Sequence, residues 1–121
     1  MSEPLARSQA ENLLPLKPVV YLLLLALAEE PCHGYGVKKK VEDISQGQVK
    51  LDPGTLYRWM GRLLDDAWVE DDERPRPDED ERRRYYRLTP RGRQMMELES
   101  QRLERLLQTA RRLKSGRQEP A

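Results

Sequence analysis

The chain has 121 residues, of which 37% are hydrophobic and 36% charged, so it has room for one domain with a modest core that a partner would help to bury. Its formal net charge of +1 favours neither nucleic acid, nor a membrane, nor an acidic substrate, so only the distribution of charge along the chain is informative. The single cysteine, Cys32, excludes an intramolecular disulfide and indicates a reducing, cytoplasmic setting.

The first thirty residues predict an arm followed by a covered helix. Residues 1–16 are polar with two prolines and are expected to form an N-terminal arm or a short helix. Pro18 suits a first helical turn, and the apolar stretch after it predicts a helix over 19–30. Its longest apolar run, Val19–Ala28, is about half of what a membrane-spanning helix needs. Acidic residues precede this run where a signal peptide would be basic, so we expect neither a membrane segment nor a leader.

A second helix is expected after the tight segment 32–34. Apolar residues recur there at helical spacing and Gly47 provides a stop signal; these residues are Val37, Val41 and Ile44. Another face of this helix carries three consecutive lysines, Lys38, Lys39 and Lys40. They either face a nucleic acid or form an ordinary solvated surface.

A third helix is expected over 53–66, with Asp52 as its N-cap and Pro53 in its first turn. Its outward-facing residues include Gly54, Thr55, Arg58 and Arg62. The two small residues would let backbone amides approach phosphates or base edges closely. The first arginine is suited to pairing with guanine and the second to contacting a phosphate.

Three residues of this helix have competing interpretations. Arg62 is as well placed to pair with Asp65 or Asp66 on its own helix as to contact DNA. Tyr57 either hydrogen-bonds a phosphate or packs against the second helix with its hydroxyl in water. Trp59 is more typical of a core or an interface than of a ligand platform.

A β-hairpin with a long tip is expected next. Its first strand begins at Trp68–Val69, and alternating residues over 84–88 predict the second strand. The polar stretch 71–81 contains two prolines and is expected to be a loop. Residues 63–81 hold ten acidic side chains against two arginines, whereas 82–93 hold six arginines and no acid. The near-neutral total therefore conceals an acidic segment beside a basic one.

The arginine run of the return strand has two interpretations. Arg82, Arg83 and Arg84 follow four acidic residues, 78–81. Either the basic stem contacts phosphate while the acidic tip points away, or the tip folds back and pairs with these arginines.

The last helix is expected to start at Thr89 as cap and Pro90, and to run to about residue 114, a length of about 37 Å. It carries a heptad-like apolar seam that one acid, Glu99, interrupts. So small a domain cannot bury this seam, so a homodimer interface is predicted. Its residues are Met96, Leu103, Leu106, Leu107, Ala110 and Leu113.

Three helices followed by a hairpin give a mostly α chain with a small β-hairpin, the order of a winged helix-turn-helix with a long C-terminal dimerisation helix. The predicted division is an arm over 1–16, a DNA-binding domain over 17–89, a dimerisation helix over 90–115 and a tail over 116–121. In such a fold the basic residues of the second helix, the third helix and the return strand converge on one surface. The alternative is that they form ordinary solvated faces.

Catalytic and metal sites are not expected. The single histidine, His33, adjoins Cys32, and no third group is spaced to orient it. One cysteine and one histidine do not make a structural zinc site, and no phosphate-binding glycine loop is present. We therefore predict a chain that is not an enzyme and has no cofactor.

Several strings in order resemble one family. They are His33-Gly34-Tyr35-Gly36, Leu51-Asp52-Pro53-Gly54-Thr55-Leu56-Tyr57, Arg62-Leu63 and Arg84-Tyr85-Tyr86-Arg87-Leu88-Thr89-Pro90-Arg91-Gly92. Together they resemble the PadR family of bacterial transcriptional regulators, over about residues 17–92. The resemblance implies a homodimeric winged helix of the short type that binds a palindromic DNA operator and usually represses. It also implies that Thr55 and Tyr57 lie at the DNA and that Tyr35 lies near its backbone.

The sequence also departs from the family pattern. Arg58 stands where the family commonly has proline, and Ala67-Trp68 replace the usual glycine and aliphatic residue. The C-terminal helix has no aromatic residue, whereas some relatives hold flat ligands between tryptophans at the dimer interface, so a small-molecule effector is unknown here. Other functions that fit the pattern are a winged helix for protein contact, a ligand-sensing regulator with a pocket at the dimer interface and, least of all, a hydrolase that uses Cys32.

Overall fold

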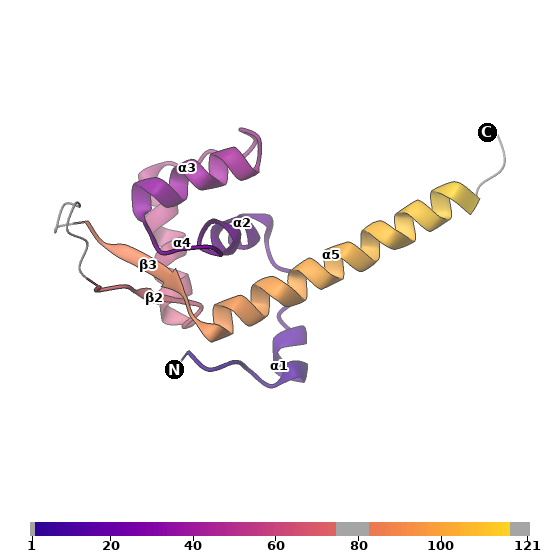
Figure 1. The fold of residues 1–121 in the computed structure, drawn as a ribbon, viewed down its shortest axis with the longest axis horizontal. Helices are drawn as coiled ribbons and strands as arrows, with labels where there is room; N and C mark the ends of the chain where they lie inside the picture. Colours follow the sequence, from indigo (N-terminus) through magenta and orange to yellow (C-terminus); the bar gives the residue numbers. More distant parts are fainter. Residues whose placement is uncertain (1, 75–82, 117–121) are drawn as a thin grey trace.

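The computed structural model describes residues 2–74 and 83–116. The elements are α1 (Arg7–Glu11), α2 (Pro18–Ala26), β1 (Cys32–His33), α3 (Gly34–Ile44), α4 (Pro53–Asp65), β2 (Val69–Asp71), β3 (Tyr85–Leu88) and α5 (Pro90–Gly116). Figure 1 shows α2, α3 and α4 gathered beside the strands, whereas the C-terminal half of α5 projects away from them. The predicted mostly α architecture with a small sheet is confirmed.

Helix α2 lies at the centre of the core because it is apolar nearly all round. Leu23 and Leu24 are fully buried, and residues from α3, α4, β3 and α5 complete the same cluster, including Val37, Val41, Leu56, Met60, Tyr86 and Met95. Burial of each large side chain contributes about 1.5–3 kcal/mol to folding. The helix ends at Ala26, earlier than the predicted residue 30. The amides of Leu27 and Ala28 bond to carbonyls three residues back, which tightens the chain into a turn.

The segment between α2 and α3 forms a third strand, so the predicted two-stranded hairpin is corrected to a three-stranded antiparallel sheet in the order β1-β3-β2. Cys32 pairs with Tyr86 and His33 with Tyr85. A strand of two residues is too short for periodicity to reveal it. The imidazole Nδ1 of His33 then accepts a hydrogen bond from the amide of Gly36 at 3.1 Å, so α3 begins at Gly34.

A tight turn joins α4 to β2. The amide of Ala67 donates to the Leu64 carbonyl and that of Trp68 to the Leu63 carbonyl, the pairing of a Schellman motif. Ala67 has a φ of +61°, which is left-handed backbone that favours glycine. Because the amide of Trp68 is used by the helix end, β2 starts at Val69 rather than at the predicted Trp68.

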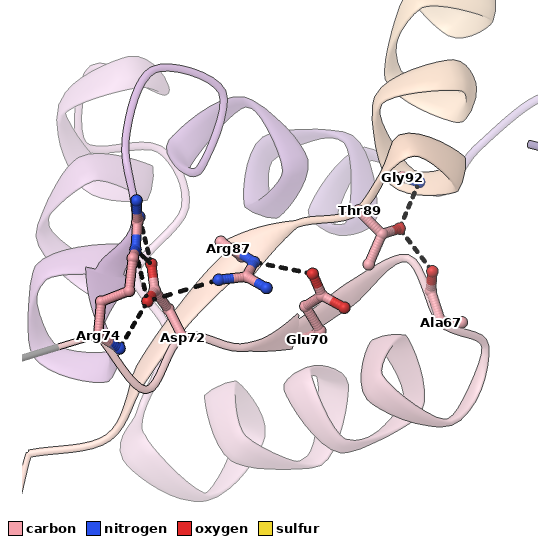
Figure 2. Close-up of polar contacts among 7 residues, drawn as sticks. All are labelled: Ala67, Glu70, Asp72, Arg74, Arg87, Thr89 and Gly92. Carbon is pink, nitrogen blue, oxygen red and sulfur yellow. Dashed lines mark hydrogen bonds and ion pairs between the residues drawn. The ribbon is translucent and has the colours of Figure 1, made fainter. Parts of the chain in front are cut away.

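Thr89 joins the sheet to α5, as predicted for a cap. Figure 2 shows its hydroxyl accepting a hydrogen bond from the amide of Gly92 at 3.0 Å and donating to the Ala67 carbonyl at 2.6 Å. A Cβ at position 92 would overlap the Trp68 carbonyl oxygen, so α5 approaches the turn this closely only with glycine there.

The N-terminal segment lies against α5 of its own chain. The amide and carbonyl of Leu5 bond to the Gln94 side chain at 2.8 and 2.7 Å, and the Arg91 amide donates to the Ser2 carbonyl. Ala10 of α1 is fully buried. The predicted arm therefore includes a short helix ordered by α5.

Candidate nucleic-acid interface

The N-terminus of α4 is built by its capping residue. The carboxylate of Asp52 accepts hydrogen bonds from the amide of Thr55 at 2.8 Å and from its hydroxyl at 3.1 Å. Both bonds lower the pKa of Asp52, and the bond from the Thr55 amide has the larger effect. The hydroxyl of Thr55 in turn accepts a hydrogen bond from the exposed guanidinium of Arg58 at 3.3 Å. Cap and arginine thus hold the Thr55 hydroxyl from two sides, while Gly54 beside it is exposed.

Tyr57 packs against another helix and also remains partly exposed, so it fits both interpretations drawn from the sequence. Its side chain is 52% exposed, yet a Cβ at position 34 would overlap its hydroxyl and ring, so the tyrosine packs against the first turn of α3. Only glycine at position 34 leaves room for this contact. The phenol therefore ties α4 to α3 and still presents a face to solvent.

The other arginine of α4, Arg62, lies over an aromatic ring. Its Cζ atom is 5.0 Å from the centroid of the half-buried Trp59 ring, in cation–π geometry. Within residues 2–74 and 83–116 it forms no ion pair with Asp65 or Asp66, so the predicted alternative of an intrahelical pair is wrong there.

The residues predicted on α3 differ in their surroundings. Tyr35 is 64% exposed, and its ring lies parallel to that of His33, with 6.5 Å between centroids. Lys38 pairs with Glu42 at 3.3 Å, as a solvated helix face would, whereas Lys39 is exposed. Lys38 therefore contributes less free positive charge to the surface than the sequence indicated.

The arginines predicted on the hairpin also differ in their contacts. Arg83 reaches toward α3, with its Nη1 atom 3.2 Å from Nε2 of His33. Arg84 instead pairs with Asp71 at 2.5 Å and lies over the Tyr86 ring at 5.2 Å. The hydrogen bond from Arg84 lowers the pKa of Asp71. Arg82 and the acidic residues 78–81, on which the interpretation of a folded-back tip depends, lie outside the described residues.

A carboxylate network at the base of the hairpin was not predicted. Figure 2 shows Asp72, whose side chain is wholly buried, held by Arg74 at 2.6 Å and approached by Arg87 at 3.5 Å. Arg87 also pairs with Glu70, its neighbour across the strands, at 2.7 Å. The sequence does place acids on one strand of the hairpin and arginines on the other. Which acid faces which arginine depends on the strand register, which the sequence alone does not reveal.

The seam predicted on α5 starts later than expected. Met96 is 8% exposed and belongs to the core of its own chain, so it leaves little surface for a dimer seam. Glu99 is 3% exposed and pairs with Arg102 through two bonds of 2.6 and 2.8 Å. Beyond it, the apolar residues of the projecting half (Figure 1) are exposed: Leu103, Leu106, Leu107, Ala110 and Leu113.

The fold thus brings together three predicted DNA-contact residues that are distant in sequence. Tyr35, Tyr57 and Arg83 meet around the first turn of α3, through their contacts with His33 and Gly34. Among the described residues, no helix has both the length and the apolarity needed to cross a membrane. In the same part of the chain, no group of three His, Cys, Asp or Glu side chains is arranged to hold a metal ion.

Comparison with known proteins identifies relatives. The chain is 38% identical over 86 residues to an uncharacterized 37.1 kDa protein in transposon TN4556 of Streptomyces fradiae; the match covers 70% of this chain but 23% of that protein. A PadR family transcription regulator from Clostridium difficile superposes with a TM-score of 0.67 at 21% identity, covering 80% of this chain and 98% of its own. Bacillus subtilis PadR in complex with operator DNA gives 0.56 at 18% identity, covering 69% and 46%.

These structural matches confirm the predicted winged-helix fold. The sequence model of the transcriptional regulator PadR-like family matches residues 23–98, more than half of the chain. Because the family consists of transcriptional regulators, the prediction that the chain is not an enzyme is also confirmed. This chain belongs to the PadR-like family of transcriptional regulators.

Proposed function

We propose that the chain is a cytoplasmic, sequence-specific DNA-binding repressor that binds a palindromic operator as a homodimer. The observation that carries this proposal is the exposed outer face of α4, beside the cluster of Tyr35, Tyr57 and Arg83. On this face Arg58, near the start of the helix, and Arg62, in its last turn, form no ion pair within the described residues. The Bacillus subtilis relative was solved with operator DNA, which supports duplex DNA as the partner.

In this proposal α4 enters the major groove and supplies the base contacts. Thr55 and Arg58 lie near its N-terminus, the end whose free amides and dipole favour anions, and Gly54 lets a phosphate approach the backbone. The guanidinium of Arg58 donates two hydrogen bonds to a guanine edge. Releasing its long 3.3 Å bond to the hydroxyl of Thr55 is a small loss.

The phosphate contacts surround this helix. Tyr35, Tyr57 and Arg83 converge at the start of α3 and would hold one backbone strand, while Lys39 and Arg62 add positive charge. Lys38 and Arg84 are held by Glu42 and Asp71, so a phosphate must compete with a carboxylate to bind either of them. They therefore contribute less to affinity.

Dimerisation rests on the projecting half of α5. Its exposed leucines lie on a helix that extends beyond the domain, and a second copy of the helix would cover them. An isologous dimer places two α4 helices with twofold symmetry, which matches a palindrome with half-sites about 34–36 Å apart. Occupancy of such a site blocks polymerase, which would make the protein a repressor.

Binding to DNA upstream of its own gene tests the proposal. We expect a gel shift whose association constant falls steeply with salt, and footprints over two half-sites one helical turn apart. Sedimentation of the free protein should give a dimer. Absence of salt-dependent binding to any duplex would contradict the proposal and favour a winged helix used for protein contact.

A further inference from the structure

The interaction of Arg62 differs from those of three other helical cations in the molecule. Arg7, Lys38 and Arg102 each pair with a carboxylate three or four residues away on the same helix. Arg62 has Asp65 and Asp66 at these spacings, yet within the described residues its guanidinium forms no ion pair and lies over the Trp59 ring.

The direction of the Arg62 side chain is consistent with its contact with the Trp59 ring. The guanidinium of Arg62 lies over the residue three positions before it, which is the direction in which helical side chains lean. Asp66 is already the C-cap of α4, beyond the last full turn. The guanidinium therefore lies over the middle of α4, on the side of Arg62 opposite to the acids at the helix end.

Stacking also leaves the chemistry of the guanidinium intact. A cation–π contact uses the flat face of the group, whereas hydrogen bonds use the N–H donors at its edge. Arg62 is exposed, so these edge donors stay available to bind a phosphate in bidentate fashion. Pairing with Asp65 or Asp66 would occupy the same donors and cancel the charge.

We propose that Trp59 is a positioning residue, which holds Arg62 away from its helical acids and presents it to a DNA phosphate. This inference rests on the proposed function. It gives a role in binding to a tryptophan that does not itself touch the nucleic acid.

A double-mutant cycle tests the inference. Fluorescence anisotropy with a labelled mixed-sequence duplex at several salt concentrations would compare Trp59→Leu, Arg62→Ala and the double variant with the wild-type chain. Each single change should weaken binding, about two- to fivefold per protomer for Trp59→Leu. Arg62→Ala should reduce the slope of log affinity against log salt by about 0.9 per protomer. In the Arg62→Ala background Trp59→Leu should have no further effect.

Two controls separate positioning from folding. Trp59→Tyr keeps an aromatic face and should restore both affinity and salt slope, which a merely structural loss would not predict. Arg105→Ala removes an exposed charge from α5 and should leave binding unchanged. In NMR spectra, the side-chain protons of Arg62 should shift upfield in the wild type and lose that shift in Trp59→Leu.

The outcomes are distinguishable. Additive effects of Trp59→Leu and Arg62→Ala, or a Trp59→Leu variant that binds like the wild type, would overturn the inference while the proposed function stands. A wild-type chain that binds no duplex at low salt would overturn the proposed function, and the role of Trp59 with it.

Discussion

The arginines of α4 and those of the β2–β3 hairpin differ in whether they pair with carboxylates. On α4, Arg58 contacts a hydroxyl and Arg62 an aromatic ring, and neither pairs with a carboxylate in the part of the chain that the structure describes. On the hairpin, Arg84 and Arg87 pair with Asp71 and Glu70. The number of arginines in a segment therefore says less about its affinity for phosphate than the register that decides which acids face them.

The largest expected effect comes from preventing the proposed dimer, in which each protomer would contribute one α4 and one hairpin. Leu106→Glu places a charge in the exposed seam of α5 and should convert the dimer to a monomer, because a buried unpaired carboxylate is strongly disfavoured. Loss of the paired half-sites should lower operator affinity by about 100-fold or more. Analytical ultracentrifugation and anisotropy measure both. Gln108→Glu adds the same charge to an exposed position outside the seam and should change neither.

The second prediction contrasts one arginine from each region. Arg58→Ala should weaken operator binding by about 1–3 kcal/mol and blur discrimination between bases, because the proposed bidentate contact with guanine would be lost. Arg83→Ala should weaken binding to all sequences alike, since a phosphate contact carries no sequence information. Footprinting and competition with mixed-sequence DNA measure the two effects. Identical behaviour of the two variants would remove this division of roles.

A substitution in the turn between α4 and β2 is expected to change the free energy of unfolding. Ala67 adopts left-handed backbone at the end of α4, where glycine is unstrained. Ala67→Gly should therefore raise the free energy of unfolding by about 0.5–1 kcal/mol, despite the greater entropy of the unfolded glycine chain. Urea unfolding measures this change. A lower stability of Ala67→Gly would contradict the strain argument.

Removal of an acid from the hairpin should make one of its arginines as available to phosphate as those of α4. Asp71→Asn frees Arg84 from its ion pair and deletes one negative charge, so affinity for mixed-sequence DNA at low salt should rise about two- to threefold. Arg84→Ala, by contrast, should change the affinity little. Anisotropy titrations compare them. A loss of affinity in Asp71→Asn would mean that the pair orients Arg84 for phosphate instead of occupying it.

The smallest effect is on acid stability. Because Arg84 lowers the pKa of Asp71 in the folded state, the pair contributes stability above about pH 4, the ordinary pKa of an aspartate, and loses it as the pH falls through the lowered value. The contribution of such an exposed pair is about 0.2–1 kcal/mol. Urea unfolding of the wild type and Arg84→Ala should differ by this amount near neutral pH and converge in acid. A constant difference would point to another cause.

Parts of the candidate site could be read from single positions in the sequence. The Asp52-Pro53 start of α4, its outward arginines and the Thr89-Pro90 start of α5 follow from local backbone chemistry, which a few adjacent residues control. The strand β1 and the packing of Tyr57 on Gly34 could not be read this way. Both depend on segments more than twenty residues apart meeting in space.

The sequence by itself determined the order of the four main helices and of the hairpin strands, because apolar spacing, caps and prolines act within a few residues. Only the tertiary structure decided which charges remain available. Strand register gave Arg84 and Arg87 their acids, and the Arg62 guanidinium lies over the Trp59 ring. Folding of the single chain already buries Met96 and Glu99 of α5. Coulomb attraction and burial act between neighbours in space, and those neighbours exist only once the chain has folded.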